Sequence, residues 1–128
     1  MSLTQKLGKR GRFAKVSNDI YIAVEPGICG FSCVVKAHKQ NKKLVTLKIT
    51  GSECKQIQRI SKSLKKITLN ELFVPVTRNP VFLAAEHAGC HPSCPIPIAV
   101  LKAAEVAMEM ALPREVSIKF ELESKDRE

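Results

Sequence analysis

The sequence predicts an α+β fold: a small antiparallel sheet, made of a hairpin and a C-terminal strand, packed with about three helices. Apolar and polar residues alternate over 29–37 and 44–50, which indicates the two hairpin strands, and again over 116–122, which indicates the returning strand. Apolar residues recur at helical spacing over 57–67. A long apolar stretch over 96–112 predicts a buried helix.

The first half of the chain contains the predicted hairpin and a strand before it. The first strand covers 20–24 and is followed by Glu-Pro-Gly at 25–27, a turn signal. The second strand covers 29–38, with apolar residues at its odd positions. A polar turn at 39–43 leads to the third strand at 44–50, so these two strands form the hairpin.

The register of this hairpin predicts where two cysteines lie. If Ala37 lies opposite Val45, then Cys29 falls opposite position 53, beside Cys54. We therefore expect Cys29 and Cys54 to meet at the open end of the hairpin.

A helix is predicted directly after the hairpin, with Ser52 as its N-cap. Its apolar stripe consists of Ile57, Ile60, Leu64 and Ile67. A basic stripe on another face of the same helix consists of Lys55, Arg59, Lys62 and Lys66. The pattern is typical of an amphipathic helix with one face in the core.

The second half of the chain is predicted to be mainly helical. Residues 72–74 are a candidate short edge strand. Asn79 is a typical N-cap and predicts a short helix over 80–88, with proline at its first position. The long apolar helix begins at Pro97, and Pro113 ends it before the final strand.

Length and charge bound the organisation of the chain. Its 128 residues suffice for one globular domain, predicted over 17–123, between a flexible basic tail at 1–16 and a disordered tail at 124–128. The net charge is +9, and residues 36–66 hold ten Lys or Arg residues but one acid. This asymmetry favours an anionic partner such as nucleic acid, bound through the basic tail and the helix face, or it is an ordinary solvated surface. With five Phe, one Tyr and no Trp, the chain has few aromatic side chains on which nucleic-acid bases could stack.

The sequence favours a cytoplasmic protein that does not span a membrane. No apolar stretch follows the basic N-terminus, so no secretory signal is evident. The longest apolar region, 96–112, is interrupted by a proline and three charged residues. The chain has five cysteines, and an odd number argues against a fully paired disulfide framework.

Cysteines are the candidate functional residues. Cys90 and Cys94 are separated by three residues in a loop stiffened by prolines. Cys29 and Cys54 can supply two more ligands if the open end of the hairpin abuts that loop. Four converging thiolates would form a tetrahedral site for zinc, and an iron–sulfur cluster uses the same ligands. The predicted metal ligands are Cys29, Cys54, Cys90 and Cys94. Zinc is the better match because the dense cysteine spacing of cluster-binding loops is absent.

Other roles for these cysteines remain open at this stage. They are equally small apolar side chains that often lie in a core, which is the interpretation for Cys33 in the middle of a predicted strand. A thiol redox protein could use Cys54 or the Cys90 and Cys94 pair. His87 and His91 flank the loop and could replace a missing ligand. If the cysteines are structural, a basic nucleic-acid-binding module is the alternative function.

Four sequence features carry a resemblance to a known group of proteins. They are P-G-I-C-G-F at 26–31, the cysteine at a helix start, C-H-P-S-C-P-I-P at 90–97 and A-L-P-R-E-V-S-I at 111–118. Over about 24–122 the chain resembles a family of small prokaryotic proteins without assigned function. The resemblance implies no activity, but it implies that Cys29, Cys54, Cys90 and Cys94 belong to one site.

Overall fold

A computed structural model of the chain describes residues 19–122, and within this range four strands form one sheet in the order β1-β2-β3-β4. Every neighbouring pair of strands is antiparallel. The strands are β1 (Asp19–Val24), β2 (Cys33–Asn41), β3 (Leu44–Thr50) and β4 (Lys66–Thr68). The helices are α1 (Lys55–Ser63), α2 (Leu69–Leu72), the 3-10 helix η2 (Val76–Arg78), α3 (Pro80–Ala88) and α4 (Ile96–Ala107). The predicted α+β class is confirmed.

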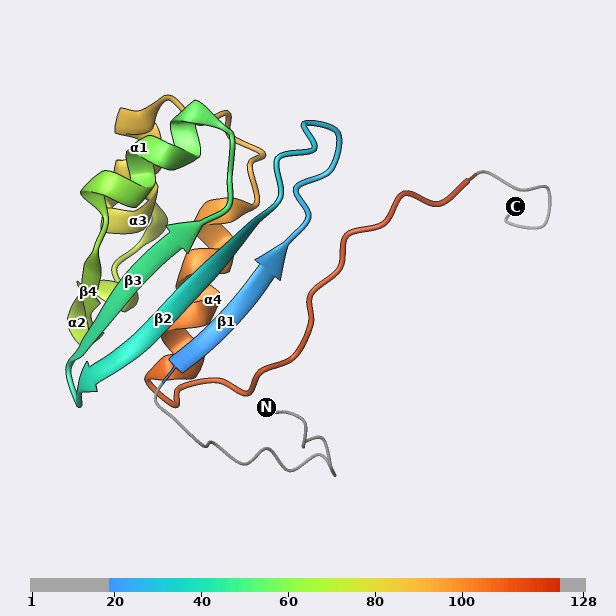
Figure 1. Cartoon of the computed structure of the whole chain (residues 1–128). Coiled ribbons are helices and arrows are strands. Elements are labelled where there is room, and N and C mark those ends of the chain that lie inside the picture. Colours follow the sequence, from blue (N-terminus) through green and yellow to red (C-terminus); the bar gives the residue numbers. More distant parts are fainter. Residues whose placement is uncertain (1–18, 123–128) are drawn as a thin grey trace.

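Helices cover one face of the sheet and leave the other face open (Figure 1). Helix α4 packs across β1, β2 and β3, and α1 packs on β3 and α3. Four residues of α4 are completely buried: Val100, Ala103, Ala104 and Ala107. Because alanine side chains are short, the helix axis lies close to the sheet, as the composition of this stretch predicts. On the open face Tyr21 is 63% exposed.

The hairpin register differs from the prediction by two residues. Ala37 pairs with Leu47, not with Val45. The turn is shorter than predicted because β2 continues to Asn41, whose side-chain oxygen accepts a hydrogen bond from the backbone N–H of Lys43 at 2.8 Å. An irregularity between Lys39 and Asn41 shifts the pairing there.

The strand predicted to begin at Cys29 begins four residues later, at Cys33. Residues 27–30 form a turn instead, closed by a hydrogen bond from Gly30 N to Gly27 O at 2.9 Å. Both glycines have positive φ angles, +99° and +73°, which a strand does not accommodate. Cys29 therefore lies in a loop between β1 and β2.

Helix α1 begins later and ends earlier than its amphipathic pattern suggests. Its N-cap is Cys54, and Ser52 instead accepts a hydrogen bond from the backbone N–H of Cys54 at 3.1 Å. The helix ends at Ser63, so Lys66 belongs to β4 and the predicted basic stripe is shorter. The short strand β4 was not predicted because three residues carry too little alternation to be recognised.

The connection from β4 to α3 is helical, and no strand covers 72–74 as predicted. Thr68 and Glu71 form a capping box that starts α2, and Leu72 is its last residue. Asn79 caps α3 as predicted, because its side-chain oxygen accepts a hydrogen bond from Val81 N at 3.0 Å.

The predicted C-terminal strand is the largest departure from expectation. Helix α4 ends at Ala107, and residues 112–122 have no regular secondary structure. In Figure 1 this segment, drawn in red-orange, leads away from the sheet. The fold class holds because β1 and β4 complete the sheet on either side of the hairpin. The predicted tails at 1–16 and 124–128 lie outside the described residues.

Candidate thiol site

All five cysteines lie at one end of the sheet, where β1 and β3 end and β2 begins. We call this region the cysteine end; its thiols come from five places in the chain. Cys29 lies in the β1–β2 turn, Cys33 begins β2, Cys54 caps α1, Cys90 follows α3 and Cys94 precedes α4. All five are free thiols.

The loop that carries Cys90 and Cys94 is held by backbone hydrogen bonds. Gly89 ends α3 in the left-handed conformation, with φ of +81°. The N–H of Cys90 then donates to the carbonyl of Ala85 at 3.0 Å, and the N–H of Cys94 donates to that of His91 at 3.1 Å. These bonds place both cysteines against the core before any ligand is present.

Arg59 of α1 connects this loop to the neighbouring helix. Its guanidinium donates a 2.8 Å hydrogen bond to the carbonyl of Ala88, at the end of α3. Burial raises the pKa of Cys90, and the positive charge of Arg59 partly opposes that rise. Arg59 thus supports the loop mechanically and places positive charge beside its first thiol.

Burial and neighbouring sulfurs keep the Cys90 and Cys94 thiols protonated. Burial is the main cause that raises the pKa of Cys90 to about 11, and the charges of Cys94 and Cys54 add to it. Burial likewise raises the pKa of Cys94, against a backbone hydrogen bond from Ile96 that lowers it. The two side chains are hydrogen-bonded to each other.

Cys33 lies with the other four cysteines, which its predicted place in the middle of a strand did not indicate. It is 4% exposed, so its assignment to the core is confirmed. However, it begins β2 and does not lie mid-strand, which brings it to the cysteine end. Burial raises its pKa to about 11, with further contributions from the charges of Cys94 and Cys54. A correct position for the start of β2 would have revealed this fifth thiol.

Cys29 and Cys54 are the most open members of the group. Cys29 is exposed. Burial is the main cause that raises the pKa of Cys94, and the Cys29 sulfur contributes to the rise. Cys54 is partly exposed and its thiol donates a 3.1 Å hydrogen bond to the side-chain oxygen of Gln56. After burial, the charge of Cys54 is a further cause that raises the pKa of three other thiols: Cys33, Cys90 and Cys94.

The thiols gather without forming a ready-made coordination shell. Within residues 19–122, no group of three or more His, Cys, Asp or Glu side chains is placed to hold a metal ion. His87 and His91 are both exposed on the surface near the loop. The four predicted ligands therefore share a region, and their joint coordination of one ion stays a prediction.

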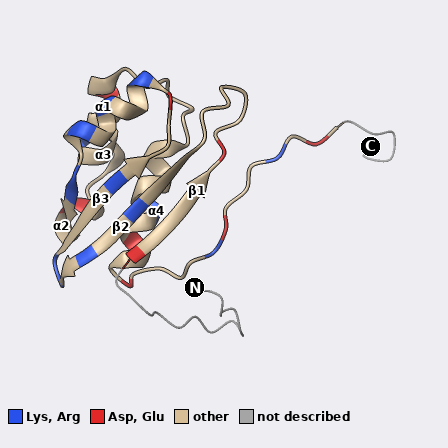
Figure 2. Ribbon diagram, in the orientation of Figure 1, with Lys and Arg blue, Asp and Glu red and all other residues tan. Residues whose placement is uncertain are grey.

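The basic residues are divided between α1 and the open face of the sheet. Lys55, Arg59 and Lys62 are exposed on α1, while Lys36 and Lys48 lie on β2 and β3 (Figure 2). Of the predicted basic stripe, Lys55, Arg59 and Lys62 lie on α1, whereas Lys66 lies on β4.

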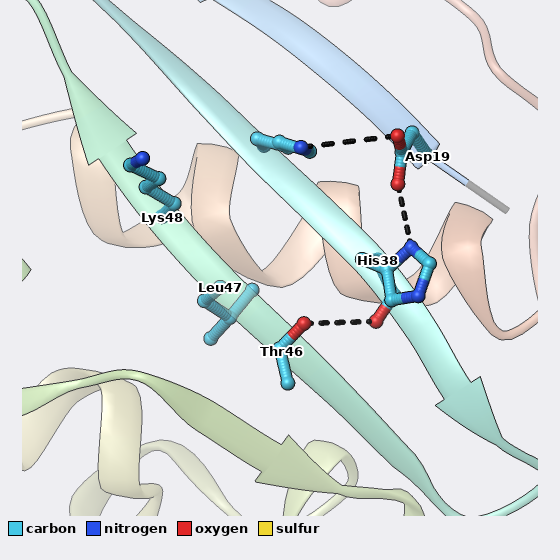
Figure 3. Close-up of a pocket in the computed structure, with 6 residues that line it drawn as sticks. Asp19, His38, Thr46, Leu47 and Lys48 are labelled. Carbon is cyan, nitrogen blue, oxygen red and sulfur yellow. Dashed lines mark hydrogen bonds and ion pairs between the residues drawn. The ribbon is translucent and has the colours of Figure 1, made fainter.

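A shallow pocket on the open face lies at the other end of the sheet from the cysteines (Figure 3). Asp19 is hydrogen-bonded to His38 Nδ1 at 2.6 Å and forms an ion pair with Lys36 Nζ at 3.8 Å. Thr46 donates to the carbonyl of His38 at 3.4 Å. Because Asp19 partly neutralises Lys36, the pocket is less basic than its lysines suggest.

In the part of the chain that the structure describes, no helix combines the length and apolar character needed to cross a membrane. Residues 20–120 match a family model described as "Family of unknown function (DUF6951)". The chain belongs to this family. No curated protein matches the chain, and no solved structure matches it either.

Proposed function

We propose that the cysteine end is a binding site for a thiophilic metal, either zinc or the iron of an iron–sulfur cluster. Cys29, Cys54, Cys90 and Cys94 are the proposed ligands. The observation that carries the proposal is the convergence of cysteines from separate strands, turns and helix ends on one end of the sheet. A purely structural use of cysteine gives no reason for all five to gather there.

The electrostatics of the group support a cation as the ligand. Part of the rise in the pKa of Cys33 and Cys90 comes from other sulfurs, whose negative charges would repel one another. A bound cation removes that repulsion, and metal binding should therefore release protons. Thiols with pKa values of about 11 are mostly protonated at neutral pH, which disfavours them as free nucleophiles.

The site needs one movement to close. Cys90 and Cys94 are already held in place by their loop, and Cys54 caps a helix beside it. Cys29 lies in an exposed turn next to Ile28, whose side chain is fully open to solvent. We propose that this turn closes over the other three thiols when metal binds, so the loop supplies the first ligands and the turn the last.

Metal content of protein purified without oxygen tests the proposal. The parent protein should bind one equivalent of zinc, or show the visible absorption of an iron–sulfur cluster. Cys90→Ser and Cys94→Ser should abolish this binding. Cys33→Ala is the matched control, because it removes a thiol from the same region that is not a proposed ligand; it should keep the metal and lose about 1 kcal/mol of stability.

Three outcomes contradict the proposal. A parent protein that takes up neither zinc, cobalt nor iron would leave no metal site. Equal metal loss in Cys33→Ala and Cys90→Ser would mean that disturbed packing removes the metal. If a mild oxidant instead links Cys90 to Cys94 reversibly in metal-free protein, the thiol redox function would replace the metal site.

The open sheet face favours a second, separate candidate function. Tyr21 of β1 pairs with Lys36 of β2, which in turn pairs with Lys48 of β3. The Tyr21 ring is exposed, and the Lys36 ammonium is 5.7 Å from its centre. We propose weak binding of single-stranded nucleic acid on this face. Affinity should fall steeply with salt and weaken in Lys48→Gln. No binding at low salt would exclude it.

A further inference from the structure

The C-terminal segment, residues 113–122, has the alternating pattern of a strand but is not paired with any strand of the described sheet. Its apolar residues alternate with polar ones and are open to solvent: Val116 is 58% exposed, Ile118 84%, Phe120 99% and Leu122 89%. Four large apolar side chains in a row on one side of an extended chain are unusual on a free surface. This alternation is the signature of a strand whose apolar side packs against a core.

The segment belongs to the domain rather than to an appended tail. The family match extends over 20–120 and therefore includes Val116, Ile118 and Phe120. The family model thus treats this stretch as part of the same unit as the sheet and helices.

The sheet offers a matching edge at β1. In the described part of the chain, β1 pairs with β2 on one side and with no strand on the other. Ile20 and Val24 on its inner side are 8% exposed, but Ile22 between them is only partly buried. An uncovered edge with an incompletely buried apolar residue is a ready template for another strand.

The position of α4 decides the direction in which the segment could meet this edge. Glu109, just after α4, pairs with Lys39 at 3.6 Å, near the end of the sheet where β1 begins. A strand that started there and lay on its own β1 would run parallel to it. Every strand pair observed in the sheet is antiparallel, and the β1 edge of a second copy can be met in that orientation.

We propose that the C-terminal segment of one copy adds as a strand to the β1 edge of a second copy, and that the exchange is reciprocal. The product is a two-fold dimer with two continuous five-stranded sheets. This inference is independent of the proposed thiol site.

In this arrangement each side of the added strand continues one face of the sheet. Val116, Ile118 and Phe120 extend the core side beside Ile22, next to α4. Ser117 and Lys119 lie on the open face, near the partner's counterpart of Lys36. The apolar residues exposed in a single copy become buried, which supplies the driving force for association.

Light scattering coupled to gel filtration of the full chain tests the proposal. The parent protein should be a dimer. Ile118→Lys and Phe120→Lys place a charge on the buried side and should weaken dimerisation about 100-fold or more. Ser117→Lys is the matched control on the other side of the strand and should remain dimeric. Circular dichroism checks that all three variants keep their fold.

Lysine cross-linking distinguishes exchange between copies from docking within one. A mixture of unlabelled and ¹⁵N-labelled protein should yield cross-links between Lys119 and Lys36 that join one light and one heavy chain. Cross-links confined to chains of one mass would place the strand on its own sheet and overturn the proposal. A parent protein that is monomeric at all concentrations would overturn it as well, whatever the variants do.

Discussion

The Cys90–Cys94 loop and the turn that carries Cys29 reach the same end of the sheet but are held there differently. The loop is bonded to the preceding helix, and Arg59 of α1 donates to Ala88 at its start. Both its cysteines pack against the core. The backbone hydrogen bonds of the turn join near neighbours, such as Gly30 N to Gly27 O and Ser32 N to Gly30 O, and Cys29 is exposed.

This difference separates a preorganised half of the cysteine end from an adaptable half. Groups that are already ordered lose little conformational entropy when they bind a ligand, whereas an open turn must be ordered at that moment. Cys90 and Cys94 should therefore determine whether a metal binds. Cys29 should determine how tightly the site closes.

The largest loss of stability is expected at Asn79, the N-cap of the helix α3 that precedes the Cys90–Cys94 loop. Asn79 is 3% exposed, accepts from Val81 N, and donates to the carbonyls of Glu71 at 3.2 Å and Val74 at 3.0 Å. Asn79→Ala removes the cap of α3 and leaves buried groups unpaired, so the free energy of unfolding should fall by about 3 kcal/mol. Urea denaturation measures it.

A second asparagine supplies the control for this prediction. Asn41 is exposed in the hairpin turn and its side chain bonds to Lys43 N at 2.8 Å. Asn41→Ala should cost less than about 1 kcal/mol, because water replaces the lost hydrogen bond. Equal losses in the two variants would contradict the role assigned to Asn79.

Alkaline pH should destabilise the metal-free, reduced protein through its buried thiols. The pKa of Cys33 and of Cys90 is raised from 9.0 to about 11 in the folded state. Between these two pKa values the unfolded chain has lost thiol protons that the native state still binds. The contribution of these thiols to the free energy of unfolding is therefore fully present below about pH 9 and is lost as the pH rises towards 11. Thermal melts across this range should show the decline.

Variants identify which thiols cause this pH dependence. Cys33→Ala and Cys90→Ala should each flatten the decline, and the double variant should flatten it further. A decline of unchanged slope in the double variant would assign the effect to other groups, such as lysines.

Loss of Arg59 should loosen the ordered half without unfolding the protein. Arg59→Met removes the bond to Ala88 and the positive charge beside Cys90, so stability should fall by about 1 kcal/mol, and the pKa of Cys90 should rise. The rate of Cys90 alkylation at fixed pH should decrease with it. Lys62→Met, on the same helix, should change neither measurement appreciably.

The smallest predicted effect compares two glycines with similar backbone conformations. Gly89 has φ of +81° in the ordered loop and Gly30 has φ of +73° in the turn, and neither has an atom within 4 Å of an added methyl group. Gly89→Ala should cost about 1 kcal/mol of global stability. Gly30→Ala should cost less than about 0.5 kcal/mol, because an exposed turn relaxes locally.

Equal losses in the two glycine variants, measured by urea denaturation, would show that the turn is as firmly held as the loop. The interpretation of the Cys29 turn as the adaptable half of the cysteine end would then be wrong.

The sequence by itself determined the elements whose signals are local. The strand β1, the helix α3 with its Asn79 cap, and the buried character of α4 all follow from residue spacing within a few turns or one strand. The α+β class follows from their order. These features depend on backbone preferences and on which side of each element is apolar.

Tertiary structure alone decided how these elements meet. The register of the hairpin shifted by two residues because the side chain of Asn41 tightened the turn, and Cys33 reached the cysteine end because β2 begins there. The alternation over 116–122 correctly signals one apolar side, yet a strand also needs an edge to pair with. Such pairing depends on contacts between residues far apart in the chain, or between chains, and local spacing carries no information about them.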